Sequence, residues 1–571
     1  MIAGQRLALR LLLLVLLAAC APAGPPASRP ALSPTPLQAG PPPPYRPEAA
    51  RREGGTATVG DWQLPKALHP LYPEPAGATY VEQALFDGLV GVDPSLGYFG
   101  ALAQEAPTPE NGGVRLTGGG MDVTYELRPG LRWSDGAPIT PGDVAFTWRV
   151  QPKTAGYDLI TGVDRTGDLG VTVHFRSVYP PYLLLFPVIL PAHRLAGIDP
   201  ARLADDPYWS RPDVVSGPFQ VADASGDRFV LVRNPHYAEG RAGMPVLGHA
   251  AHLDRLVFQG FATKSAEEAA LQAGDVDVAL ELNERDLDVA RRIAGARLSP
   301  VPSLAYEQVT FNLDDPLFKS DRALVDALAR GLDRRALADR VLGGRAPLAE
   351  GPISPLVAWV PRPPGYPTDP AAARRELDAE GWAVGAGGIR VRAGQPLQLT
   401  LVTTADSPLR ASEADAIAAS YRTLGVDVRV QAVPADQLFA GYPSGVLARG
   451  AFQAALWSWV VPPDPDGLFA VLDSAEVPSA ARPAGQDFGR CRSREIDAAL
   501  ADGRATLDRA HRADAYRRFE IAYQAAGCEV PLFQRLDVGL AARRLHNFAP
   551  NPTAAGNTWN VADWWLDSMA S

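Results

Sequence analysis

The chain has 571 residues, of which 46% are hydrophobic and 21% are charged, a composition typical of folded domains and unlike that of disordered proteins. At roughly 100 to 200 residues per domain, this length predicts two to four folded units and excludes a single small module. The 64 acidic residues outnumber the 54 basic ones, for a net charge of −10, so nucleic acid is not an expected partner. No lysine follows a glycine, which excludes a phosphate-binding P-loop.

The first twenty residues have the layout of a signal peptide. Two arginines precede a leucine-rich run over residues 11–17, and small residues then lead to Cys20. The run is shorter than the 18 or more apolar residues that a membrane-spanning helix needs. Residues 17–20, Leu-Ala-Ala-Cys, resemble a bacterial lipobox. We expect residues 1–19 to be removed and Cys20 to be lipidated; the alternative is a plain signal peptide with an incidental cysteine.

Residues 20–53 predict a tether. This stretch is rich in proline and has almost no large apolar residue, which favours an extended polyproline conformation over packed structure. At about 3.1 Å per residue, such a linker reaches on the order of 100 Å from a membrane.

A folded body is predicted from Gly54 onward. Sequence patterns predict strands over residues 56–60, 123–127, 171–175 and 229–233, and helices over 79–85, 265–273, 321–332 and 508–525. Asp135 and Gly136 indicate a hairpin turn, and Thr140 can cap a helix whose first residue is Pro141. Strands and helices mixed in this order predict an α/β body of several hundred residues.

Several motifs in this body resemble those of one protein family. The first runs from residues 125–130, Tyr-Glu-Leu-Arg-Pro-Gly, to Asp143 and Val144. The others lie at residues 216–219 with 231–237, 273–278, 311–312 with 321–334, and 368–382. In this order they resemble extracytoplasmic solute-binding protein family 5 of bacterial ABC importers, whose members bind peptides, nickel or opines. The resemblance implies an α/β, periplasmic-binding-protein-like type II fold, with two lobes around a hinge and ligand in the cleft between them.

The same resemblance implies a division of the chain. Lobe I would comprise residues 54–92, 214–303 and 537–571, with a further subdomain, residues 93–213, inserted in it, and lobe II would comprise residues 304–536. The chain would cross between the lobes near residues 306–311 and 533–538, two strand-like runs able to absorb closure.

The strongest candidate for the ligand site is the stretch of residues 452–466, because a binding cleft needs aromatic walls and a few fixed polar groups. A strand here would place Trp457 and Trp459 on one face, with Asp464 and Asp466 after it. The alternatives are packing within the lobe for the tryptophans and helix capping for the aspartates. Weaker candidates, for which core packing is equally expected, are Trp62, Tyr80, Tyr306, Trp359 and Trp559.

One position departs from the pattern of the peptide-binding branch of the family, whose members often have an acidic residue here that pairs with the α-amino group of the peptide. Aligned on Asp464 and Pro465, that position falls on Val460 or Val461. Without the carboxylate, a ligand ammonium loses a charge-assisted hydrogen bond worth about 1.5 to 3 kcal/mol. The resemblance favours a short peptide as ligand, and an oligosaccharide, an opine or a metal chelate stay open.

Cys491 and Cys528 are the only cysteines after Cys20. An exported protein meets oxidising conditions, and the helix predicted between the two residues can bring them together. A disulfide and two free thiols are both open, because the distance between the partners does not follow from the sequence.

No motif of a common catalytic nucleophile or zinc site occurs in the chain, so we expect no catalytic residue, no metal and no cofactor. The family resemblance, together with the signal-peptide layout, implies an exported, monomeric, non-enzymatic receptor, lipid-anchored at the outer face of the cytoplasmic membrane or in the periplasm. It would capture a solute, close around it and deliver it to a permease and its ATPase subunits. The alternatives are a surface enzyme or chaperone that reuses the fold, and a structural adhesin.

Overall fold

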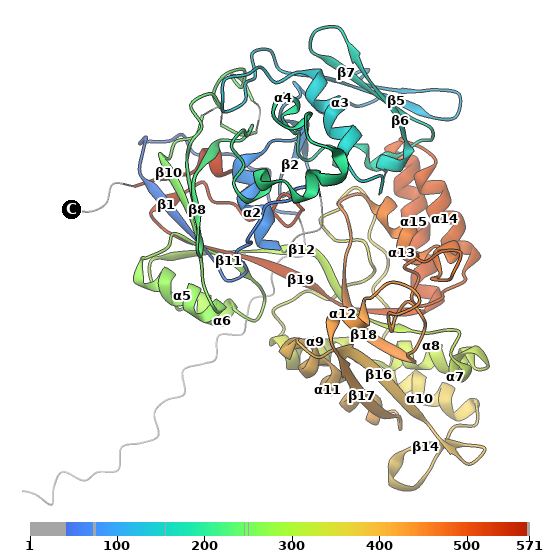
Figure 1. The fold of residues 1–571 in the computed structure, drawn as a ribbon. Helices are drawn as coiled ribbons and strands as arrows, with labels where there is room; N and C mark the ends of the chain where they lie inside the picture. The colour runs from blue at the N-terminus through green and yellow to red at the C-terminus, as the bar shows by residue number, and fades with distance from the viewer. Residues whose placement is uncertain (1–40, 72–75, 155, 245, 249, 568–571) are drawn as a thin grey trace, which may run out of the picture. The chain divides into compact units, whose positions relative to one another are not determined.

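The computed structural model describes residues 41–567 except 72–75, 155, 245 and 249 (Figure 1). The predicted signal peptide and Cys20 lie outside the described residues. Within the described part of the chain, no helix is both long and apolar enough to cross a membrane. The described residues all belong to one compact unit of tertiary contacts.

A ten-stranded mixed sheet organises the described body. Its strands, in spatial order, are β17 (Asp427–Val433), β16 (Gln398–Thr404), β18 (Ala454–Val460), β12 (Ala296–Phe311), β19 (Glu529–Ala542), β11 (Val278–Leu282), β1 (Thr56–Asp61), β10 (Arg255–Gly260), β9 (Arg228–Arg233) and β8 (Phe219–Ser225). We call β1 with β8 to β11 the β1 side of the sheet, and β16 to β18 the β18 side.

The long strands β12 and β19 join the two sides (Figure 1). They pair with each other in antiparallel register, with an irregularity between Pro302 and Tyr306. Over residues 305–311, β12 also pairs with β18, whereas β19 pairs with β11 through residues 538–541. Both expected crossing segments, 306–311 and 533–538, thus lie inside continuous strands, and the lobe boundaries drawn around them stay a prediction.

Helices and apolar clusters cover the β1 side of the sheet. One cluster joins α2 (Ala76–Leu85) to the C-terminal segment around the fully buried Trp564. A second cluster joins α5 (Lys264–Ala273) and α6 (Leu287–Ala290) to β11 and β19. Helix α5 begins where Thr263 Oγ1 accepts a hydrogen bond from the Ala266 backbone N–H, 3.2 Å away, and it ends at Gly274, whose φ of 84° suits glycine.

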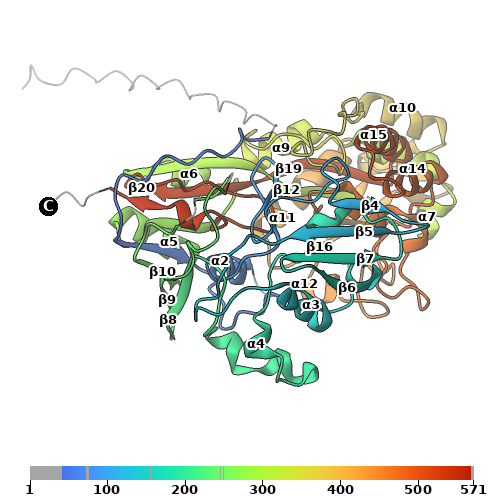
Figure 2. The ribbon, with the colours of Figure 1, turned by 90° about the horizontal axis from the view of Figure 1, so that it is seen from above.

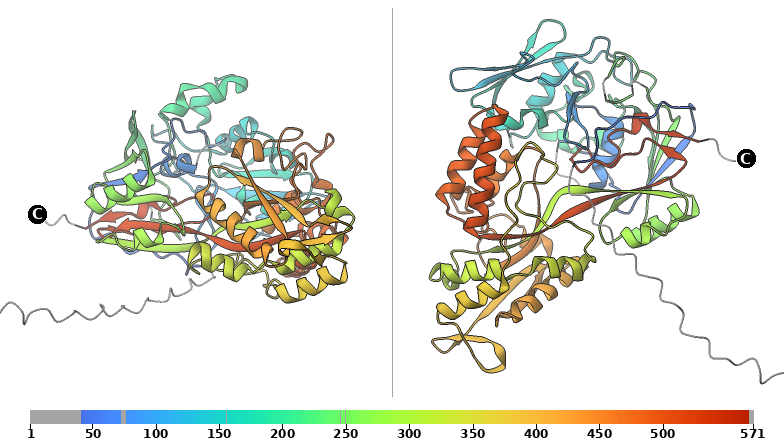
Figure 3. Two further views of the ribbon diagram at one scale, coloured as in Figure 1. Left: turned by 90° about the horizontal axis from the view of Figure 1, so that it is seen from below. Right: turned by 180° about the vertical axis from the view of Figure 1, so that it is seen from behind.

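The β18 side carries the helices of the second half of the chain. They are α8 (Arg322–Gly331), α9 (Arg334–Leu342), α10 (Pro370–Ala379), α11 (Pro408–Arg422), α14 (Arg494–Arg504) and α15 (Arg509–Ala526), and the last two lie side by side (Figure 3). Aspartates cap four of them by accepting backbone hydrogen bonds in the first turn: Asp321, Asp333, Asp369 and Asp508. A disulfide joins Cys491 to Cys528, beyond the ends of α14 and α15.

A separate four-stranded sheet lies in residues 93–213. Its order is β4 (Val114–Leu116), β5 (Met121–Glu126), β7 (Gly170–Phe175) and β6 (Ile160–Thr166), and α3 (Pro141–Val150) packs beside β6 and β7 (Figure 2). Thr140 is the N-cap residue of α3, as predicted, and its backbone N–H and its hydroxyl both donate to Asp143 Oδ2, at 2.8 and 3.0 Å.

The remaining elements are short. They are β2 (Val90–Val92), β3 (Tyr98–Gly100), β13 (Ala383–Val384), β14 (Arg390–Arg392), β15 (Gln395–Pro396), β20 (Leu545–His546), β21 (Trp565–Leu566), α4 (Ala192–Leu195), α7 (Pro316–Lys319), α12 (Ala435–Leu438) and α13 (Phe469–Leu472).

Residues 41–53, the described end of the predicted tether, have neither helix nor strand, but they contact the body. The Glu48 backbone N–H donates to Asn547 Oδ1 over 2.8 Å, and Asn547 Nδ2 donates back to the Glu48 carbonyl. Glu53 pairs with His252 at 2.7 Å. Residues ahead of Gly54, the predicted start of the folded body, therefore already contact that body.

Candidate functional site

Two adjoining cavities mark the candidate site. The first has a volume of about 470 Å³ and the second about 620 Å³, within the range of small-molecule sites. Leu184, Val460, Val461 and Pro462 line both. The walls combine residues from α2 and the C-terminal segment, from residues 93–213, and from the loop after β18, so all three predicted parts of the body contribute.

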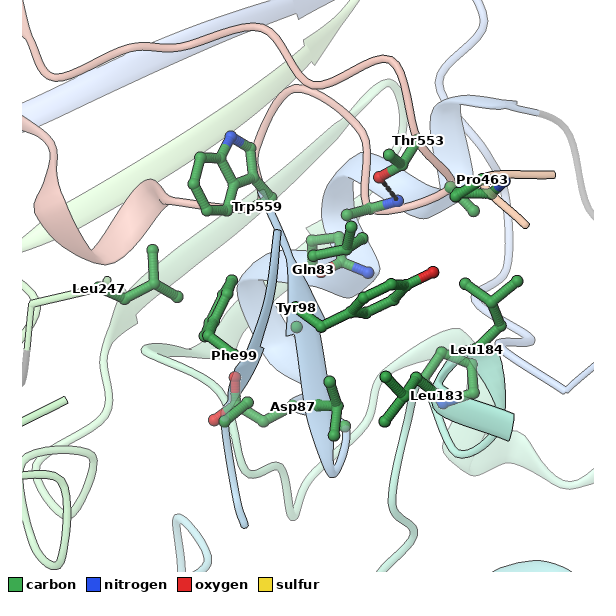
Figure 4. Close-up of a pocket in the computed structure, with 18 of the residues that line it drawn as sticks. Gln83, Asp87, Tyr98, Phe99, Leu183, Leu184, Leu247, Pro463, Thr553 and Trp559 are labelled. Carbon is green, nitrogen blue, oxygen red and sulfur yellow. Dashed lines mark hydrogen bonds between the residues drawn. The ribbon is translucent and has the colours of Figure 1, made fainter. Parts of the chain in front are cut away.

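Aromatic rings form much of the wall of the first cavity (Figure 4). The β2–β3 hairpin supplies Tyr98 and Phe99, and the C-terminal segment supplies Trp559, whose ring lies 6.3 Å from that of Phe99. Trp559 Nε1 donates to the Ala549 carbonyl, 2.9 Å away, which fixes the indole. Phe99 lies directly over Gly91, where a Cβ would come within 2.3 Å of the ring, so only glycine permits this approach.

The polar groups of the first cavity are mostly neutral. The Gln83 amide and the Tyr98 hydroxyl face it (Figure 4). Burial, reinforced by the charge of Asp464, raises the pKa of Tyr98, so its hydroxyl stays protonated. Asp87 also lines the cavity, but its Oδ2 lies 2.5 Å from Nη2 of the fully buried Arg241.

The loop after β18 presents its aspartates to the second cavity already paired. Asp464 accepts two hydrogen bonds from Arg512, at 2.5 and 2.9 Å. Asp464 Oδ1 also accepts the Asp466 backbone N–H and so caps the short 3-10 helix Pro465–Leu468. Asp466 Oδ1 lies 3.2 Å from Arg504 Nε, and burial raises the pKa of Asp466. Both aspartates line the second cavity. Asp464 has the capping role that was the alternative, whereas the side chain of Asp466 pairs with Arg504.

The two tryptophans of β18 differ in role. Trp457 is only 1% exposed and packs in an apolar cluster with Leu438 and Phe452, so the packing alternative holds for it. Trp459 lines the second cavity, and its ring stacks on that of Phe488 at 5.9 Å.

Four other predicted residues line neither of these cavities. Tyr306 is 1% exposed, because its part of β12 runs between β18 and β19 through the core. The Tyr80 hydroxyl donates to Glu281 Oε1 at 2.5 Å, Trp62 lies beside Lys264, and Trp359 packs on Arg512 and Tyr516. Trp559 is the weaker candidate that does line a cavity.

Sequence reasoning missed several lining residues, among them Gln83, Tyr98, Phe99, Tyr179 and Arg504. A signal for two of them exists at the β2–β3 turn. Asp93 Oδ1 accepts the backbone N–H groups of Ser95 and Gly97, each at 2.8 Å. An Asp-Pro-Ser-Leu-Gly turn of this kind between two short apolar runs indicates a hairpin.

Comparison with known proteins identifies the family. The sequence profile of bacterial extracellular solute-binding proteins, family 5, middle region, matches residues 103–477. The chain belongs to this family. As a family 5 protein it is an extracytoplasmic solute-binding receptor of ABC transport and not an enzyme, and a small solute and a permease are its partners. The family resemblance of the sequence motifs is confirmed.

Individual family 5 relatives are similar to this protein over most of its chain. The oligopeptide-binding protein AppA of Bacillus subtilis is 23% identical over 90% of this chain and 92% of its own. The structure of that protein in complex with a nonapeptide matches this chain with a TM-score of 0.70, and the match covers 92% of this chain and all of the other. NikZ from Campylobacter jejuni, solved with Ni(L-His), is 22% identical, has a TM-score of 0.69, and covers 89% of this chain and 99% of its own. The predicted two-lobe α/β fold is thereby confirmed.

Proposed function

We propose that this protein is a lipid-anchored, monomeric receptor that captures a short peptide in the two adjoining cavities and delivers it to the permease of an ABC importer. The observation that carries the proposal is the make-up of the walls. Gln83 comes from α2, Trp559 from the C-terminal segment, Val460–Pro463 from the end of β18 and the loop after it, and Leu183 and Leu184 from residues 93–213. A solute held there contacts every part of the body.

Such contacts supply the free energy for closure, because a ligand shifts a conformational equilibrium only by its differential affinity for the two states. We place lobe I at residues 54–92, 214–303 and 537–571, the inserted subdomain at 93–213, and lobe II at 304–536. In this division β12 and β19 are the hinge.

Peptide as the solute rests on the relatives named for oligopeptide binding and on the volume and mainly apolar lining of the first cavity. Lipidation at Cys20 rests on the lipobox-like residues 17–20. Together with the proline-rich stretch after Cys20, the lipid would hold the receptor near its permease.

The test is mass spectrometry of small molecules released by denaturing residues 41–571, purified without refolding from cells grown on peptide-rich medium. Starting at residue 41 keeps Tyr45 and Glu48, which contact the body. Recovery of a discrete set of peptides is the expected result. Recovery of a sugar or a metal chelate in place of peptides would contradict the peptide proposal and leave the receptor role of the family intact.

A further inference from the structure

Every carboxylate that lines the two cavities in the described part of the chain has an arginine partner. Five acidic residues occur in the two linings. The pairs and their shortest N to O distances are Asp87 with Arg241 at 2.5 Å, Asp158 with Arg176 at 3.2 Å, Asp464 with Arg512 at 2.5 Å, Asp466 with Arg504 at 3.2 Å, and Glu476 with Arg482 at 3.7 Å. The acidic charge of both linings is thus compensated by the protein itself.

Positive charge in the linings is compensated in the same way. Among the described residues, Arg504 is the one basic residue in the two linings, and it is held by Asp466. Neither a ligand cation nor a ligand anion meets an uncompensated counter-charge among these side chains. Either would give up hydration without a charge partner in return, which opposes its burial.

Val460 occupies the place where the cavities meet, and it is 69% exposed although it is a large apolar residue. The residue ends β18 and packs in none of the apolar clusters of the described residues. Val461, Pro462 and Pro463 continue this apolar run along the wall of the first cavity. A valine that leaves most of its surface open beside a cavity is suited to cover an apolar ligand group.

The hydrogen-bonding groups available to a ligand are neutral. No hydrogen bond joins the side chain of Gln83 or of Tyr98 to another residue in the described part of the chain, and both face the first cavity (Figure 4). An amide and a hydroxyl recognise carbonyl, amide or hydroxyl groups without requiring charge.

From these observations we infer that the site selects a peptide whose cavity-bound end is uncharged and apolar, such as an N-acylated end, in place of a free ammonium group. The inference rests on the proposed peptide-receptor function and deepens it. Three observations favour an uncharged, apolar ligand end. The carboxylates of the wall are paired with arginines, Val460 has an open apolar surface, and Gln83 and Tyr98 offer neutral hydrogen-bonding groups.

The test uses one synthetic mixture of lysine-free hexapeptides with apolar first residues, prepared with free amino termini and with N-acetylated termini. The two preparations are mixed in equal amounts and passed over immobilised residues 41–571, and retained peptides are quantified by mass spectrometry. We expect the acetylated form of each retained sequence to be enriched by about tenfold, the ratio that corresponds to roughly 1.4 kcal/mol.

A pair of variants locates the effect. Val460→Asp adds one carboxylate without an arginine assigned to it, and we expect it to shift retention toward free amino termini. Val460→Asn matches the shape of the aspartate variant without its charge. It also removes the apolar surface of Val460, so we expect it to retain both peptide forms less than the parent protein does, without the shift toward free amino termini. The exposure of Val460 makes both substitutions compatible with folding, which thermal unfolding verifies.

The possible failures are distinguishable. Equal or stronger retention of free amino termini by the parent protein would overturn the inference and leave the peptide-receptor function standing. Retention of neither form would contradict the proposed peptide function, and the inference with it. An unchanged preference in Val460→Asp would overturn the placement of the ligand end beside Val460.

Discussion

The ring of Tyr45 packs edge-on against Trp559, with ring centroids 4.9 Å apart. Trp559 forms part of the wall of the first cavity, and the Tyr45 hydroxyl donates to Asp563 Oδ2 over 2.9 Å. A segment within the predicted tether, residues 20–53, is thereby fastened to the back of the candidate site.

This contact predicts that Tyr45→Ala weakens both folding and ligand binding. Loss of the aromatic pair alone is worth about 0.5 to 1.5 kcal/mol, and it frees the Trp559 ring on the side away from the cavity. Tyr45→Phe is the matched control, since it keeps the ring and removes only the hydrogen bond. Urea unfolding and calorimetric titration with the recovered solute measure the two effects. Identical stability of Tyr45→Ala and the parent protein would contradict the role given to the contact.

A buried charge cluster at the proposed hinge gives a second prediction. Arg535 on β19 lies 2.7 Å from Glu284 and 3.0 Å from Glu307, both fully buried. Arg535→Met leaves two buried carboxylates without this partner, and we expect it to cost about 3 to 5 kcal/mol of unfolding free energy. Arg492→Met, which breaks a half-exposed pair with Asp314, is the control and is expected to cost under about 1 kcal/mol. Comparable costs for the two variants in chemical denaturation would contradict the prediction.

Glu520 is expected to make the stability of the folded protein depend on pH. Burial raises the pKa of this glutamate to about 8, against a lowering influence from the backbone N–H of Ile353. The folded state holds this proton more tightly than the unfolded state. The free energy of unfolding therefore falls as the pH rises from about 4.5 to about 8, and it changes little above pH 8.

Glu520→Gln removes this titration. Relative to the parent protein, the variant is expected to gain stability between pH 5 and pH 8, by an amount on the order of a few kcal/mol. Urea unfolding of both proteins at several pH values provides the difference curve. A difference that does not vary with pH would contradict the assignment.

The disulfide between Cys491 and Cys528 closes a loop with a sequence separation of 37. In the chain-entropy description, a crosslink over such a loop stabilises by about 3 to 4 kcal/mol. We expect the double substitution to serine to lower the denaturant midpoint accordingly and to abolish any effect of a reducing agent. If a reducing agent left the parent midpoint unchanged, the stabilising role of the bond would be contradicted.

The success of sequence reasoning followed the range of the interactions. Helix α8 was expected at 321–332 and spans Arg322–Gly331, because its cap, Asp321, is local. The pairing of Asp464 with Arg512 joins residues 48 positions apart, so no local pattern shows that this aspartate is already occupied. The same holds for the wall formed by Phe99 and Trp559, which come from distant segments and meet only in the folded chain.

The most direct test of the account is calorimetric titration of the recovered solute with a variant in which the shared space is filled. Leu184 lines both cavities, so Leu184→Trp is predicted to weaken binding at least about tenfold, roughly 1.4 kcal/mol. Leu116→Trp, at a position 58% exposed on β4, is predicted to bind like the parent protein. Undiminished binding by a folded Leu184→Trp protein would contradict the assignment of these cavities as the solute site.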